Sequence, residues 1–144
     1  MVDTCVYTPF ECLDRIRDRV DLFLYDLKMM DDDKHREVTG VSNRIIMENM
    51  MKLSEKKSHI RVRIPVITGV NDSINNLVQI AEFLKSLRNI EGISLMPFHE
   101  TGSQKYKNLD MPFKGAEVQS PSAGKITQFK IRFEKYGFNV SVGN

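Results

Sequence analysis

Five side chains in this sequence have the chemistry to bind a small charged ligand: Asp3, Asp26, Lys28, Arg63 and His99. Lysine and arginine suit an anionic group such as a carboxylate. The two aspartates suit an ammonium group, a small cation or hydroxyl groups. A histidine can stack on a ring or hydrogen-bond to it. Together the five side chains describe a zwitterionic ligand that carries a polar ring, if the fold brings them to one place.

The geometry of a β-strand explains why Asp26 and Lys28 would act together. Residues 22–27 are too few for a buried helix and are typical of a strand covered on both faces. Side chains alternate along a strand, so Asp26 and Lys28 point to the same side as Leu22 and Leu24. A strand that ends in inward-pointing charges ends at a rim, and in barrels built of β-α units that rim carries the chemistry.

Each candidate also has an ordinary structural interpretation. Asp26 and Lys28 could form a chance ion pair at a solvated strand end. Arg63 could only cover the end of a barrel, His99 could be a satisfied histidine near the core, and Asp3 could cap a turn or a helix.

Strand-like and helix-like patterns alternate along the chain. Strands are expected at 1–4, 22–28, 60–67, 93–99 and 138–142, and helices are expected to begin near 8–9, 31, 42, 71–72 and 120–122, with a long loop at 101–120. This alternation predicts an α/β fold with parallel strands and right-handed crossovers. The 144 residues read as a single domain, 1–144, which is too short for a closed eight-stranded barrel. Half of a barrel or a small open sheet is therefore expected.

Three local features give sharper expectations. Thr8 and Glu11 fit a capping box at a helix start, and Cys12 and Ile16 would share the buried face of that helix. Pro65 lacks an amide donor, so an irregular ladder is expected in its strand.

Composition excludes several classes of function. Lys and Arg number 21 against 19 Asp and Glu, a net charge of +2, which is too small to indicate a nucleic acid or an anionic membrane surface as partner. The apolar runs fall far short of a membrane span. Cys5 and Cys12 match neither a disulfide framework nor a common metal site, so a cytoplasmic, reducing compartment is expected.

Six short segments occur in an order and spacing that resemble a known family. They are Asp3-Thr4, Leu24-Tyr25-Asp26-Leu27-Lys28, Gly40-Val41-Ser42-Asn43, Arg63-Ile64-Pro65-Val66-Ile67, Gly69-Val70-Asn71-Asp72 and Leu95-Met96-Pro97-Phe98-His99-Glu100. The pattern resembles the glycyl-radical-enzyme activating enzymes, whose best-known member is pyruvate formate-lyase-activating enzyme. The resemblance covers about 2–106 and fades beyond it, and Thr68 stands where many relatives have proline.

The resemblance implies an oxidoreductase of anaerobic metabolism, in the radical S-adenosylmethionine superfamily, built on a partial (β/α)6 barrel. In that family a 4Fe-4S cluster binds S-adenosyl-L-methionine and reduces it, and the resulting 5′-deoxyadenosyl radical takes a hydrogen atom from a glycine of a partner enzyme. The implied partners are a glycyl-radical enzyme similar to pyruvate formate-lyase and a flavodoxin- or ferredoxin-type reductant.

The resemblance also suggests roles for individual residues. It places Asp26 and Lys28 at the cofactor, with Lys28 and Arg63 near its carboxylate and His99 near its adenosine. Asp3 and Asp26 would line a site for a monovalent cation beside the cofactor.

One part of the family pattern is missing from this chain. The family binds its cluster through three cysteines in a CxxxCxxC motif, and the sequence contains no such motif. We therefore expect the carboxyl-terminal half of a radical S-adenosylmethionine barrel, with no catalytic residue of its own, inactive alone and prone to self-association through an uncovered strand edge.

Two other functions stay open on the residues alone. Lys28 at a barrel rim could be the Schiff-base nucleophile of an aldolase-like half-barrel, although Asp26 beside it would favour the charged amine. A half-barrel could also serve only as a binding or assembly module.

Overall fold

The strands lie in the sheet in the same order as in the chain. The computed structural model describes residues 1–98 and 119–143, and in these ranges the strands form one five-stranded sheet in the order β1-β2-β3-β4-β5. Every neighbouring pair is parallel. The strands are β1 (Val2–Thr4), β2 (Phe23–Asp26), β3 (Ile60–Val66), β4 (Ile90–Pro97) and β5 (Val140–Val142). The expected α/β class with parallel strands is confirmed.

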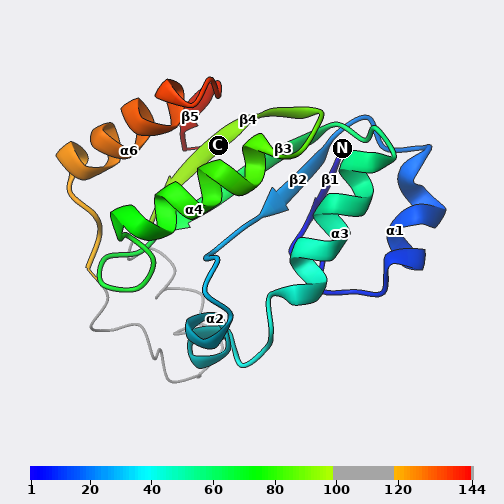
Figure 1. Cartoon of the computed structure of the whole chain (residues 1–144), viewed down its shortest axis with the longest axis horizontal. Helices are drawn as coiled ribbons and strands as arrows, with labels where there is room; N and C mark the ends of the chain where they lie inside the picture. The colour runs from blue at the N-terminus through cyan, green and yellow to red at the C-terminus, as the bar shows by residue number, and fades with distance from the viewer. Residues whose placement is uncertain (99–118, 144) are drawn as a thin grey trace, which may run out of the picture.

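Helices connect successive strands, as a β-α repeat requires. They are α1 (Phe10–Arg17), α2 (Asp32–Thr39), α3 (Arg44–Glu55), α4 (Ile74–Lys85) and α6 (Ala123–Lys135). Figure 1 shows α3 and α4 lying along one face of the sheet, and α6 runs beside β4 and β5. None of the helices in the described ranges is long and apolar enough to cross a membrane.

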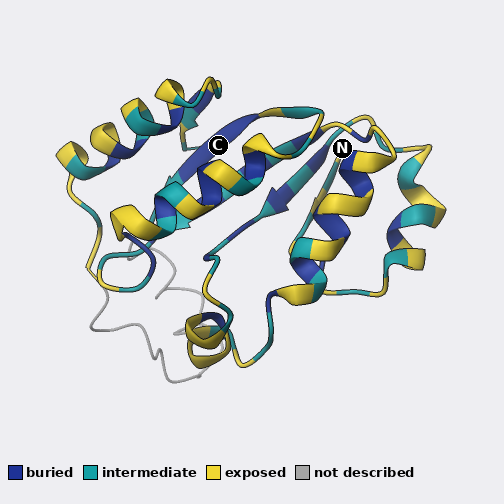
Figure 2. Cartoon of the chain, in the orientation of Figure 1, coloured by how far each residue is buried: buried dark blue, intermediate teal, exposed yellow. Residues whose placement is uncertain are grey.

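The two faces of the sheet differ in burial because strand side chains alternate. Phe23, Tyr25 and Val62 are fully buried beneath the helices, and the core-facing sides of α3 and α4 are buried with them (Figure 2). Burial of each large apolar side chain contributes about 1.5–3 kcal/mol. The opposite face carries partly exposed side chains, including Leu24, Asp26 and Arg63. Asp26 and Arg63 therefore lie on the face of the sheet opposite α3 and α4.

The expectations for the first helix are wrong in two respects. Pro9 occupies the N-cap position of α1 and no side chain caps it, so the capping box at Thr8 and Glu11 does not form. Cys12 is exposed, and the helix instead turns Leu13 toward the core. Helical residues lie about 100° apart, so a shift of one position moves the whole buried stripe.

Pro65 leaves the ladder between β3 and β4 intact, contrary to expectation. It pairs with Met96, and the register shift lies at Ile60 and Arg61. The N–H and C=O of one residue point to the same side of a strand, and so do those of the residue two positions later. The carbonyl of Arg63 points toward β2, where it accepts a hydrogen bond from the Leu27 N–H. The missing N–H of Pro65 therefore faces β2 just where β2 ends.

Candidate functional site

Three neighbouring strands bring Asp3, Asp26 and Arg63 into contact. Asp26 on β2 is the register partner of Arg63 on β3, and β1 carries Asp3 on the other side of β2. The Arg63 Nε donates to Asp26 Oδ1 at 2.7 Å, and Nη1 donates to Asp3 Oδ2 at 2.7 Å. Nη2 donates to the second oxygen of Asp3. We call these three residues the charged cluster.

Arg63 is the centre of the charged cluster and its least exposed member. Its side chain is 17% exposed, against 27% for Asp26 and 57% for Asp3. Partial burial acts to lower the pKa of Arg63, but the hydrogen bonds and negative charges of Asp3 and Asp26 outweigh it and raise that pKa above its usual value. The guanidinium thus stays protonated, and the cluster carries one net negative charge.

Lys28 lies beyond the end of β2 and is only partly exposed. In the described part of the chain it forms no ion pair with Asp26, whose carboxylate is bound by Arg63. Lys28 and Asp26 instead line a small cavity of about 70 Å³ together with Cys5 and with polar and apolar residues of the α2–α3 region. Lys28 therefore shares this cavity with Asp26, a member of the charged cluster.

Two features of helix α2, which supplies part of the cavity wall, were not foreseen. His35, to which the sequence assigned no role, is 2% exposed, and its Nδ1 lies 2.7 Å from the carbonyl oxygen of Val41. Asp32 accepts from the hydroxyl of Ser42 at 2.7 Å and from the backbone N–H of Asn43 at 2.8 Å. These two bonds hold the pKa of Asp32 down to about 2. The sequence signal that could have indicated a role for His35 is its spacing of four residues from Thr39. The two side chains hydrogen-bond each other across one turn of the helix.

Not all predicted site residues can be placed. His99 lies outside the described residues. Arg63 binds the carboxylates of both Asp3 and Asp26, and the cation site expected at these two residues stays a prediction. Across residues 1–98 and 119–143 no three His, Cys, Asp or Glu side chains gather as metal ligands.

The donor groups fit one of the two implied cofactors and not the other. A partly exposed lysine beside a cluster of carboxylates and guanidinium suits a zwitterionic ligand such as an amino-acid group. Cys5 and Cys12 are both exposed and lie on separate elements, so together they do not form the ligand set of an iron–sulfur cluster.

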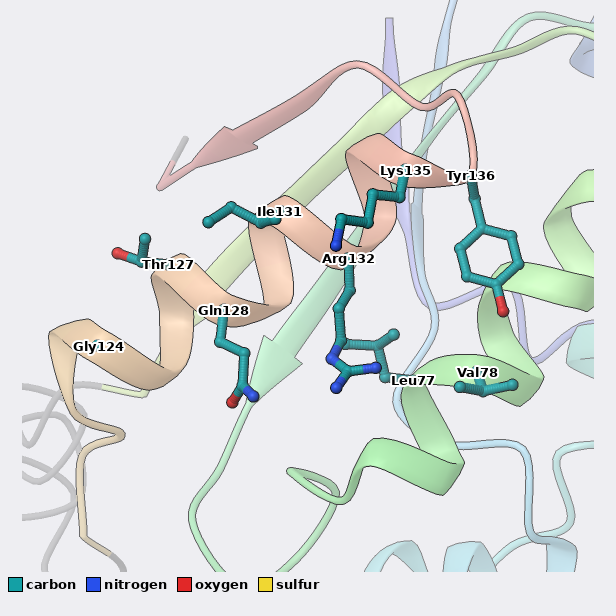
Figure 3. A pocket seen from close by; sticks show the side chains of 9 residues that line it. All are labelled: Leu77, Val78, Gly124, Thr127, Gln128, Ile131, Arg132, Lys135 and Tyr136. Carbon is teal, nitrogen blue, oxygen red and sulfur yellow. The ribbon is translucent and has the colours of Figure 1, made fainter.

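A separate groove lies between α4 and α6, away from the strand ends (Figure 3). Its volume is about 490 Å³, and Leu77, Ile131 and Tyr136 form apolar walls beside the cations of Arg132 and Lys135. It contains none of the predicted site residues. The groove thus belongs to the outer helical layer rather than to the charged cluster.

Comparison with known sequences gives a consistent group of relatives. A scan against protein-family profiles finds no match. The trans-4-hydroxy-L-proline dehydratase activating enzyme of Clostridioides difficile is 43% identical over 144 residues, which is 99% of this chain and 47% of that protein. The choline trimethylamine-lyase activating enzyme of Oleidesulfovibrio alaskensis is 38% identical over 98% of this chain and 46% of its own length. The pyruvate formate-lyase-activating enzyme of Staphylococcus epidermidis is 33% identical over 83% of this chain and 52% of its own length. The chain spans about half the length of these curated relatives.

Solved structures agree with the sequence comparison. The crystal structure of a domain of a pyruvate formate-lyase-activating enzyme from Bacteroides vulgatus superposes with a TM-score of 0.83 and 31% identity, over 99% of this chain and 80% of that one. A radical SAM methyltransferase from Sphaerobacter thermophilus has a TM-score of 0.72, 21% identity and coverage of 98% of this chain and 39% of that one, a likeness of fold alone.

Proposed function

This chain belongs to the glycyl-radical-enzyme activating enzymes, the family of pyruvate formate-lyase-activating enzyme, and on that premise we propose that it is part of an enzyme that installs a glycyl radical on a partner. The partner would be a glycyl-radical enzyme of the pyruvate formate-lyase kind, and the electron would come from a flavodoxin- or ferredoxin-type reductant. The observation that carries the proposal is the charged cluster formed across β1, β2 and β3, on a fold shared with a domain of such an enzyme.

S-adenosyl-L-methionine bound at a 4Fe-4S cluster would supply the radical chemistry. The residues of this chain would bind and orient that cofactor. Lys28 would pair with its carboxylate, because it is the cation beside the charged cluster that has no ion-pair partner in the described part of the chain. Arg63 would fix the two aspartates, so that Asp26 and Asp3 face the cofactor's ammonium group or a monovalent cation beside it. His99 would lie near the adenosine.

The ligands of the iron–sulfur cluster would come from another part of the protein, which would make residues 1–144 a single carboxyl-terminal half-barrel. The relatives are about twice as long as this chain, which agrees with such an arrangement. The chain alone would then be inactive and would take up no stoichiometric cluster on anaerobic reconstitution. Iron and sulfide analysis with an absorption spectrum tests this, and a stoichiometric four-iron cluster would contradict it. The genomic sequence upstream of Met1 should encode CxxxCxxC.

The decisive experiment compares two lysines in the full-length protein with its cluster intact. Lys28→Ala should weaken the binding of S-adenosyl-L-methionine about tenfold to a hundredfold, because a hydrogen bond to a charged group contributes about 1.5–3 kcal/mol. Lys34→Ala is the matched control, since Lys34 is exposed on α2. Anaerobic titration measures both affinities. Equal affinities for the two variants would remove Lys28 from the cofactor site.

A further inference from the structure

The backbone that follows β2 is held by side chains rather than by a neighbouring strand. Residues 28–30 lie beyond the end of β2 and lead into α2. The carbonyl of Lys28 accepts a hydrogen bond from Asn71 Nδ2 at 2.8 Å. Asn71 is 6% exposed and comes from the turn after β3, 43 positions further along the chain.

Two more asparagines complete the enclosure of this segment. Asn43 Nδ2 donates to the carbonyls of Met29 and Met30 at 3.1 and 2.9 Å, and Asn43 is 4% exposed. The N–H of Met30 donates to Asn76 Oδ1 at 3.0 Å. Asn43 precedes α3, Asn71 precedes α4, and Asn76 lies in α4. Side chains from three places in the fold therefore converge on three consecutive residues.

The asparagines are themselves held in place. Asn76 Nδ2 donates to the Asn71 carbonyl at 3.0 Å, and Asn71 Oδ1 accepts from the Ile67 N–H at 2.8 Å. Asn43 is bonded through its own N–H to Asp32 at 2.8 Å. A primary amide can donate and accept at once, which an aspartate or a serine cannot do in the same geometry. Buried networks of this kind are rigid when every member is satisfied.

We propose that Asn43, Asn71 and Asn76 form a clamp that orients Lys28 toward the carboxylate of the cofactor. The three are positioning residues, because they touch the lysine's backbone and its neighbours and not the ligand. A lysine side chain has large rotamer freedom, so its ammonium reaches a fixed point only when the direction of its Cα–Cβ bond is fixed. This inference rests on the proposed function, which places the cofactor at Lys28.

The chain contains a matched control for the clamp. Asn49 is 1% exposed, and its Nδ2 donates to the carbonyls of Val6 and Thr8 at 3.0 and 2.8 Å. It uses the same chemistry to hold the loop after β1, which does not include Lys28. Asn49→Ala should therefore cost stability, as Asn71→Ala does, without the same effect on Lys28.

The test is a double-mutant cycle on the full-length holoenzyme, with affinity for S-adenosyl-L-methionine as the readout. Asn71→Ala should weaken binding about five- to tenfold, and should have no further effect in a Lys28→Ala background. Asn49→Ala should leave the affinity unchanged. Where Asn71→Ala does not fold, Asn76→Ala replaces it, because Asn76 is only half-buried and makes one bond to the segment.

The outcomes separate the clamp from the proposed function. If Lys28→Ala weakens binding but Asn71→Ala adds its own independent loss, the clamp is overturned and the cofactor site stands. An equal loss from Asn49→Ala also overturns the clamp. If Lys28→Ala has no effect, both fail together.

A second readout needs no cofactor. Amide hydrogen exchange at Met30 should be slow in the present chain, fast in Asn76→Leu and still slow in Asn76→Asp, because aspartate keeps the acceptor for that N–H. Equal exchange rates in all three would show that the asparagine does not hold the segment.

Discussion

Arg63 joins two carboxylates that come from two other strands, and its removal leaves both without their shared cation. Arg63→Ala should lower the free energy of unfolding by about 1–2 kcal/mol, the lower part of the range for charged hydrogen bonds, because Asp3 is largely exposed. Arg61→Ala is the control: Arg61 lies on the same strand and the same face, and forms no ion pair in the part of the chain that the structure describes. Urea unfolding of both variants measures the difference. Equal losses would show that the ion pairs contribute nothing measurable.

Thr68 differs from Arg63, because its hydroxyl group has no hydrogen-bond partner among the described residues. Its Oγ1 is buried and forms no hydrogen bond to the described residues. Thr68→Val keeps the shape and removes the unsatisfied group, so it should raise the free energy of unfolding by about 1 kcal/mol. Thr39→Val should lower it instead, because Thr39 Oγ1 donates to the His35 carbonyl at 2.7 Å. A loss of stability in Thr68→Val would show that the hydroxyl is satisfied in solution.

For individual residues, the sequence was enough to predict which charged side chains come together, but not the contacts of the asparagine side chains. Strand alternation was enough to place Asp26 and Arg63 on one face of neighbouring strands, because the period of two is strict. The position of Arg63 in the middle of β3, rather than at its end, was not predicted. No comparable period governs Asn71, which reads as a helix cap from its local sequence. The cap of α4 is Ser73, because the side chain of Asn71 is used to bind Ile67, Pro65 and Lys28. Contacts that span 43 positions leave no local signal.

Helix α6 packs Phe129 and Phe133 into the core, and a partly buried ion pair within the described ranges also joins it to the turn before α4. Lys125 Nζ contacts Asp72 Oδ2, and the Asp72 side chain is 10% exposed. Burial acts to raise the pKa of Asp72, but the Lys125 bond and the Gly69 N–H outweigh it and lower that pKa below its usual value. The resulting stabilisation is complete above the unfolded pKa, about 3.9, and is lost as the pH falls through the lower folded value.

Asp72→Asn should therefore remove a pH-dependent contribution. At pH 7 the variant should be less stable by about 1–3 kcal/mol, because the ammonium of Lys125 loses its charged acceptor. Below about pH 4 its stability should fall less steeply than that of the unmodified chain. Urea titrations from pH 7 down to pH 2.5 measure both curves. Parallel curves would mean that the pair does not form in solution.

At the scale of elements, boundaries were predicted well where a cap and a stop residue agree. Asp31 caps α2 and Gly40 ends it in the left-handed conformation, as expected. The first helix was misread because Thr8, Pro9 and Glu11 fit a start signal that the chain does not use. A capping box is a local preference, and the contact of Leu13 with the core decides the actual phase of the helix.

Among the described residues, β1, a strand of three residues, is one edge of the sheet. Within the described residues β1 pairs with β2 alone, whereas β2 is paired on both sides. The backbone of Asp3 faces outward, because that of Val2 is bonded toward β2. Such an edge can pair with another copy.

The present chain should therefore self-associate as its concentration rises. Light scattering over a range of concentrations measures this, and Val2→Lys should reduce it, because an edge lysine opposes pairing. Val38→Lys, at an exposed position of α2 rather than on a strand, is the control, with circular dichroism to check folding. A monomer at all concentrations would contradict the prediction.

The agreement between strand order and chain order has a consequence for biosynthesis. Each new strand pairs with the one made immediately before it, so no strand must wait for a distant partner to emerge from the ribosome. Parallel strands normally pair slowly, because the chain between them must close into a loop before they meet. Here each such loop is a single crossover between neighbouring strands. The polypeptide can thus assemble its sheet by accretion at one edge while translation is still under way. Asn43 is made before β3 and can hold Met29 and Met30 early, whereas Asn71 and Asn76 follow β3 and can complete the clamp only after that strand has been made.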